Sequence, residues 1–142
     1  MSGRLKIYLK ANERFYINGA VIKVDRKVSI ELLNDVVFLL DSQVIQEEQA
    51  NTPLRRLYFV VQSMLIDPAT TPLAMRVYAD THTLLLATFK DQDVLEGLVD
   101  VRNLIERRRI FDALKRIRSL LPLEEKLIQS GALPEQIDKA VA

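Results

Sequence analysis

The chain has 142 residues, of which 49% are hydrophobic and 27% are charged, which suits one soluble domain or two small subdomains sharing one core. Its 20 Lys and Arg residues against 19 Asp and Glu residues give a net charge of +1, so only a local concentration of charge could mark a nucleic-acid partner. The chain has no cysteine and one histidine, which excludes disulfides, thiolate metal sites, Cys nucleophiles and any site that needs two histidines.

The first third of the chain is predicted to form short antiparallel strands. Apolar and polar side chains alternate from Leu5 to Lys10, with the period of a half-buried strand. Asn18-Gly19 separates two further runs and predicts a tight hairpin, because both residues accept a positive φ. The apolar run 36–40 is expected to be covered on both faces. The predicted strands occupy residues 5–10, 14–17, 20–24, 28–33 and 36–40, with 44–45 as a candidate last segment.

The rest of the chain is predicted to form about four helices, because apolar residues recur at helical spacing. Pro122 lies within the fourth apolar stripe and is expected to kink or briefly break that helix, and Gly131 is the expected residue after its end. The predicted start signals of the first three helices are Thr52-Pro53, Thr71-Pro72 and Asp91, and the fourth stripe runs from Ile110 to Leu121.

These patterns predict an α+β fold in which a small N-terminal antiparallel β-meander precedes a C-terminal bundle of about four helices. We expect a β subdomain over 1–46, a helical subdomain over 52–131 and a weakly ordered tail over 132–142. The N-terminus does not resemble an export signal, and the longest apolar stretch, 57–66, is too short to span a bilayer. A cytoplasmic protein without membrane association is therefore expected.

The sequence contains no motif typical of an enzyme, and we expect neither catalysis nor a cofactor. His82 lies on the apolar stripe of the second helix, so a buried, hydrogen-bonded role is expected rather than a metal or catalytic site. Glu47 and Glu48 lie in a polar stretch typical of a solvated loop, and Glu124 and Glu125 should point to different sides of a helix. The four glycines are widely separated, which excludes a glycine-rich phosphate loop.

One segment of the predicted fourth helix concentrates positive charge. Asp112 is its single acid, so the segment carries +5 while the whole chain carries +1. Bases around the exposed arc of an amphipathic helix suit a surface that follows nucleic-acid phosphates. A solvated helix face, neutralised by nearby glutamates, is an equally open interpretation. The candidate RNA-binding bases of this segment are Arg107, Arg108, Arg109, Lys115, Arg116 and Arg118.

A second, smaller basic cluster lies among the strands, at Lys23, Arg26 and Lys27. Aromatic residues are close to it in sequence, and aromatics beside bases on a sheet can stack on unpaired RNA bases. The alternative is that the aromatics belong to the core and the bases keep a strand edge soluble. The aromatic residues in question are Tyr8, Phe15 and Tyr16.

Four segments, taken in order, resemble a known family. They are Leu5-Lys-Ile-Tyr-Leu-Lys10, Asn12-Glu-Arg-Phe-Tyr-Ile-Asn-Gly-Ala-Val21, Thr52-Pro-Leu-Arg-Arg-Leu-Tyr-Phe-Val-Val-Gln-Ser-Met64, and Ala113-Leu-Lys-Arg-Ile-Arg-Ser-Leu120 followed by Glu124-Glu125. Together they resemble FlbT, the flagellar biosynthesis repressor family of alphaproteobacteria, over nearly the whole chain to about Ser130. Ala11-Asn12 departs from the Pro-Gly turn expected there, which leaves the form of that turn open.

The resemblance implies a post-transcriptional repressor that binds the 5′ untranslated region of flagellin mRNA and lowers its translation and lifetime, although some members are described as activators. The resemblance also implies that the protein acts together with the small protein FlaF, that it uses no cofactor and that it has no enzymatic activity. The alternative is a chaperone-like interaction module that senses flagellin or FlaF and acts on mRNA indirectly. The basic segment favours the first interpretation, whereas the near-neutral charge and apolar stripes favour the second. Self-association into a homo-oligomer is a further possibility.

Overall fold

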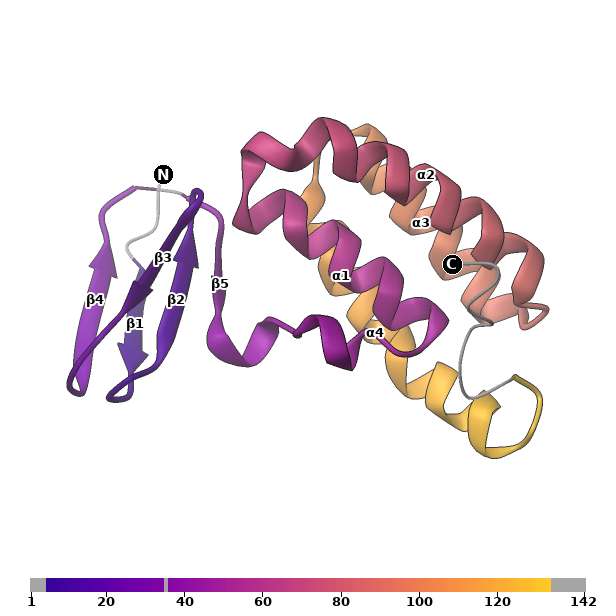
Figure 1. Ribbon diagram of the computed structural model, residues 1–142, viewed down its shortest axis with the longest axis horizontal. Helices are drawn as coiled ribbons and strands as arrows, with labels where there is room; N and C mark the ends of the chain where they lie inside the picture. Colours follow the sequence, from indigo (N-terminus) through magenta and orange to yellow (C-terminus); the bar gives the residue numbers. More distant parts are fainter. Residues whose placement is uncertain (1–4, 35, 134–142) are drawn as a thin grey trace.

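The computed structural model describes residues 5–34 and 36–133, and it places a small β region beside a bundle of helices (Figure 1). The segregated α+β fold predicted from the sequence is confirmed, whereas most of the tail expected to be weakly ordered lies outside the described residues. The strands are β1 (Leu5–Leu9), β2 (Arg14–Ile17), β3 (Ala20–Lys23), β4 (Val28–Leu32) and β5 (Phe38–Leu40). The α-helices are α1 (Pro53–Ile66), α2 (Thr71–Thr88), α3 (Gln92–Glu106) and α4 (Ile110–Gln129). Short 3-10 turns occupy η1 (Asp41–Gln43), η2 (Glu47–Gln49) and η3 (Pro68–Thr70).

The strands are antiparallel, but they form two small sheets rather than a simple meander. The β2–β3 hairpin is confirmed, and both Asn18 and Gly19 have positive φ values, 47° and 82°. However, β1 pairs with β4, and β2 lies between β3 and β5. Sequence order alone predicted neighbouring pairs, whereas this arrangement buries an apolar layer made by both sheets. The turn before β2 retains a left-handed residue, because Asn12 has a φ of 68°.

Strand β2 separates two apolar cores because successive side chains point to opposite faces. Phe15 packs with Ile7 and Leu9 of β1 in the small core of the β region. Tyr16 points the other way and joins Leu39 of β5 in the core of the helical bundle. The β region is therefore attached to the bundle by apolar side chains of β2 and β5.

The segment around β5 follows its prediction in part. Leu39 is buried in the helical core, while Phe38 and Leu40 pack against the core of the β region, so this strand is covered on both faces as predicted. The strand is shorter than the run 36–40, and Val37 before it is 49% exposed. Residues 44–45 are not a strand. The side-chain amide of the buried Gln62 instead accepts from the Ile45 N–H at 2.9 Å and donates to the Ile45 carbonyl at 2.8 Å.

The helix boundaries mostly follow the predicted signals. Thr52 caps α1 by accepting the Arg55 N–H at 3.2 Å, and Asp91 caps α3 by accepting the Val94 N–H at 3.1 Å. Helix α2 begins at Thr71 itself, so the cap residue is one position earlier than expected.

Helix α4 continues from Ile110 to Gln129 with Pro122 inside it, so the predicted alternative of a brief break is wrong. Side chains on both sides of Pro122 are buried, Leu120 before it and Glu124 after it, and they hold the two parts of the helix in place. The predicted end is confirmed, because Gly131 has a φ of 78° and its N–H donates to the Ile128 carbonyl at 3.1 Å.

The bundle core is continuous through all four helices, and its fully buried members include Leu57, Leu85, Leu98, Leu114 and Ile117. Helix α4 packs against both α1 and α3, and α2 packs against α1. No helix within the described part of the chain combines the length and apolar character needed to cross a membrane.

A buried carboxylate joins the two ends of the helical region. Glu124 of α4 is 2% exposed, and its two oxygens accept from the Thr52 hydroxyl at 2.5 Å and the Leu54 N–H at 2.7 Å. The donors belong to the cap residue and the first turn of α1, where free N–H groups and the helix dipole favour a negative charge. Burial raises the pKa of Glu124 above its ordinary value, although these hydrogen bonds oppose the rise. Glu125, in contrast, is exposed, so the predicted divergence of the two glutamates is confirmed.

Candidate nucleic-acid interface

The predicted basic segment begins in the corner between α3 and α4. Arg108 has a φ of 62° there, and its N–H donates to the Ile105 carbonyl at 3.0 Å, while the Arg109 N–H donates to the Leu104 carbonyl at 2.9 Å. These bonds close the end of α3, which favours cations beside its free carbonyl groups. The positive charge at Arg107–Arg109 thus complements a helix end, and all three residues are exposed.

Two arginines of the segment form surface ion pairs. Arg109 Nη2 lies 2.7 Å from Asp112 Oδ2, within the first turn of α4. Arg116 Nε lies 3.1 Å from Asp100 Oδ2 of α3, and its Nη1 donates to the Ser119 hydroxyl at 2.9 Å. Exposed pairs of this kind contribute at most about 1 kcal/mol to stability. They do, however, reduce the charge that Arg109 and Arg116 offer to a phosphate.

Arg118 is held in the interior contact between α4 and α1. Its guanidinium donates to the Tyr58 hydroxyl and lies 5.5 Å from the centre of the Tyr58 ring. The same hydroxyl donates to the Gln43 carbonyl at 2.6 Å, so the network reaches the segment that follows β5. Arg118 therefore has a structural role that its place in the sequence did not reveal.

Three bases of the segment remain exposed and form no ion pair with the residues that the structure describes. They are Arg107, Arg108 and Lys115, and the Lys115 ammonium lies 5.7 Å from the centre of the Phe111 ring. We call these three residues the basic corner. Of the six bases predicted from the sequence, these three are thus exposed and without an ion pair among the described residues; two lie in the turn between α3 and α4, and Lys115 lies in the second turn of α4.

The second predicted cluster lies on the β region, away from the basic corner (Figure 1). Lys23, Arg26 and Lys27 are all exposed. Arg26 forms a 3.4 Å contact with Asp25, but both side chains are about four-fifths exposed, so this pair contributes little.

The three nearby aromatics differ in exposure. Phe15 and Tyr16 are 2% and 7% exposed, so their stacking on RNA bases is excluded, and the alternative assignment of these two residues to the core is correct. Tyr8 is 71% exposed, so its ring is accessible for stacking on an RNA base.

His82 has the structural role expected from its position. It is 4% exposed, and its Nε2 lies 2.7 Å from the Leu98 carbonyl of α3, to which it donates because that oxygen can only accept. Its ring also lies 5.4 Å from the Tyr78 ring, one turn earlier on α2. Across the described residues, no group of three or more His, Asp or Glu side chains is placed to hold a metal ion.

A family profile described as "Flagellar protein FlbT" matches residues 5–128 of the chain. Three similar proteins carry the name probable flagellum biosynthesis repressor protein FlbT. The protein from Mesorhizobium japonicum is 52% identical over 128 residues, which cover 90% of this chain and 87% of that protein. The protein from Chelativorans sp. is 50% identical over 136 residues, 96% of this chain and 94% of that protein. The protein from Rhizobium etli is 44% identical over 146 aligned positions, 100% of this chain and 98% of that protein.

No solved structure matches the chain. The profile covers both the β region and the bundle, and the relatives align along almost their whole lengths. The chain therefore belongs to the FlbT family of flagellar proteins.

Proposed function

We propose that this chain is a cytoplasmic, non-catalytic repressor of flagellin synthesis that binds the 5′ untranslated region of flagellin mRNA and blocks its translation or promotes its degradation. The observation that carries the proposal is family membership, because relatives about half identical over nearly the whole chain are named flagellum biosynthesis repressors. The names of these relatives do not mention RNA, so RNA binding is our addition to the repressor role. The exposed positive charge of the basic corner supports that addition.

The basic corner is the best candidate for phosphate contacts. Arg107, Arg108 and Lys115 present exposed cations whose charge is not neutralised by a carboxylate within the described residues. Arg109 and Arg116 would have to exchange an aspartate for a phosphate, and Arg118 would have to leave Tyr58. We therefore place the main contacts on the first three bases.

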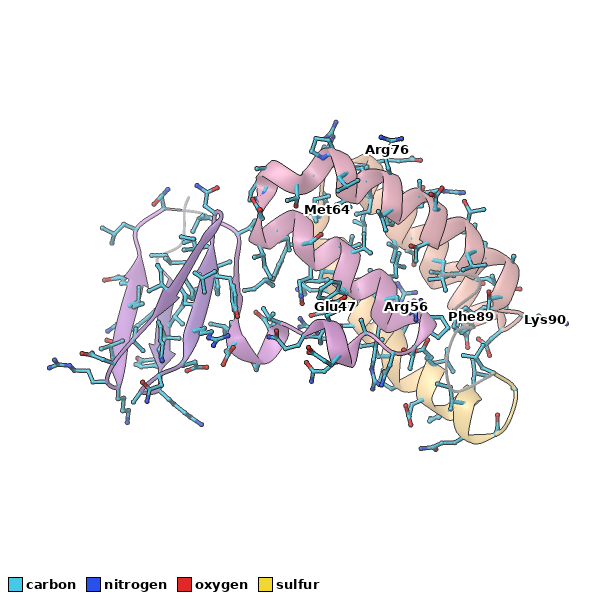
Figure 2. All side chains as sticks on the ribbon, viewed as in Figure 1. Glu47, Arg56, Met64, Arg76, Phe89 and Lys90 are labelled. Atoms are coloured by element: carbon cyan, nitrogen blue, oxygen red, sulfur yellow. The ribbon has the colours of Figure 1, made fainter. Side chains whose placement is uncertain are left out.

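A gel shift or anisotropy titration of the purified protein with flagellin leader RNA tests this proposal. Arg108→Glu combined with Lys115→Glu should weaken binding by at least about 25-fold near 0.1 M salt and flatten the salt slope by about 1.4 units, as expected for two lost contacts to a single strand. The matched control is Arg56→Glu combined with Lys90→Glu, which changes the net charge equally. Arg56 lies on α1 and Lys90 follows α2, and both lie on the side of the bundle away from the turn between α3 and α4 (Figure 2).

Arg108→Gly separates binding from folding. Glycine tolerates the positive φ at this position, so the variant should gain about 1 kcal/mol of stability while losing a cation. Weaker RNA binding by a more stable protein cannot arise from unfolding. If the wild-type protein fails to bind leader RNA, the proposal of direct RNA recognition is wrong. If the wild-type protein binds and the variants of the basic corner bind equally well, the RNA contacts lie elsewhere.

A second candidate function, recognition of flagellin or FlaF, is favoured by apolar residues exposed on α2. Leu73 and Val77, one helical turn apart, are 65% and 43% exposed. Titration calorimetry with each purified partner tests this candidate. Leu73→Glu combined with Val77→Glu should abolish binding if α2 is the contact, whereas unchanged heat would exclude that face.

A further inference from the structure

One face of the β1–β4 sheet presents polar side chains around a single aromatic ring. Ile7 and Leu9 point inward and are buried, so Lys6 and Tyr8 point outward. Tyr8 lies opposite Ser29 of β4, which leaves its ring without a bulky neighbour across the strand pair. At 71% exposure it is the most exposed large hydrophobic side chain in the described part of the chain.

Three lysines surround this ring along the two strands. Lys6 and Lys10 are each two residues from Tyr8, which is about 7 Å along a strand. Lys27 immediately precedes β4, beside the last pair of the ladder, Leu9 and Val28. Two carboxylates are nearby, Glu31 opposite Lys6, and Glu13, which accepts the Lys10 N–H at 2.8 Å. The face is therefore weakly cationic, with an aromatic centre.

An exposed aromatic ring between flexible cations has the features that bind unpaired nucleotides. A base stacks on the ring, which requires no particular base identity, and lysines on each side can reach the flanking phosphates. The sheet holds the ring in place, because the inward side chains of β1 are anchored in the core with Phe15. The alternative is that this face meets only solvent. Polar side chains alone would suffice for that, and the exposed Tyr8 ring would then have no role.

We propose that the outer face of β1 and β4 is a stacking platform for a single-stranded RNA segment, with Tyr8 stacking on one base and Lys6, Lys10 and Lys27 contacting the adjacent phosphates. This inference rests on the proposed function and assigns it a second contact surface, separate from the basic corner. The weak net charge of the face makes base stacking its main contribution to affinity.

Fluorescence anisotropy with two probes, labelled flagellin leader RNA and a short oligouridine, tests the platform. Tyr8→Ala should weaken binding of both probes by about 5- to 150-fold and leave the salt slope unchanged, because a stacking contact releases no counterions. Tyr8→Phe keeps the ring and should bind like the wild-type protein. Val99→Ala, which removes an exposed apolar side chain from α3, is the matched control and should also leave RNA binding unchanged.

The outcomes separate this inference from the function on which it rests. If the wild-type protein binds RNA and Tyr8→Ala binds equally well, the platform is wrong and the proposed function stands. If the wild-type protein binds neither probe, both proposals fall. If Tyr8→Ala loses binding to flagellin or FlaF while keeping RNA, this face is a protein interface and the platform is wrong. Circular dichroism and urea unfolding of each variant establish that the fold is retained.

Discussion

Replacement of Glu124 should reveal how strongly α4 holds the start of α1. Glu124→Ala removes the acceptor for two donors, the Thr52 hydroxyl at 2.5 Å and the Leu54 N–H at 2.7 Å, in a site that is almost fully buried. A buried donor left without a partner costs about 1–3 kcal/mol, so we expect a loss of about 3 kcal/mol from the free energy of unfolding. Glu124→Gln keeps the side-chain length and one acceptor oxygen, and should cost about 1 kcal/mol.

Urea unfolding at neutral pH, followed by circular dichroism, measures these free energies. The matched control is Glu125→Gln, an exposed neighbour on the same turn, which should change stability by less than about 0.5 kcal/mol. If Glu124→Ala costs less than about 1 kcal/mol, the two donors find other partners and the capping argument is refuted. A cost equal to that of the Glu125 variant would refute it as well.

The same carboxylate predicts a pH dependence with a definite sign. Burial raises the pKa of Glu124 above 4.5 in the folded protein, so the folded state retains this proton to a higher pH than the unfolded chain does. Stability should therefore fall as pH rises from about 4.5 through the folded-state pKa. Glu124→Gln lacks the titrating group and should show a flatter profile in that window. If the wild-type protein instead gains stability relative to Glu124→Gln as pH rises, the direction of the shift is wrong.

Three further substitutions probe the bundle. Gly97→Ala should lower the free energy of unfolding in urea by about 1–3 kcal/mol, because the new Cβ would lie 2.6 Å from the Leu120 side chain. Alanine favours a helix more than glycine does, so a gain in stability would show that α3 and α4 separate easily. Tyr78→Phe should be neutral or stabilise the protein by up to about 1 kcal/mol, because the buried Tyr78 hydroxyl has no hydrogen-bond partner among the described residues. Burial also raises the pKa of this hydroxyl to about 12. A lower melting temperature of the variant would mean that the hydroxyl is hydrogen-bonded. His82→Gln should cost about 1 kcal/mol through its bond to Leu98 and leave RNA affinity unchanged, whereas lost affinity in a folded variant would assign His82 a functional role.

The sequence by itself determined the local structure of this protein. Asn18-Gly19, Thr52-Pro53, Asp91 and Gly131 act through their own φ preferences or through hydrogen bonds to residues three or four positions away, so their effects could be predicted without a fold. The alternation of strands and the apolar stripes of the helices are local in the same sense. Order and spacing of four segments also sufficed to recognise the FlbT family, which the comparisons confirmed.

Only the tertiary structure decided which residues far apart in sequence meet. Alternation within a strand indicates a buried face but not a neighbour, so the pairing of β1 with β4 could not be predicted. For the same reason the sequence could not show which bases of the basic segment have partners: Arg118 meets Tyr58, and Arg116 meets Asp100. A carboxylate such as Glu124 is indistinguishable in sequence from its exposed neighbour, because burial and hydrogen-bond partners arise only when α4 packs against the start of α1.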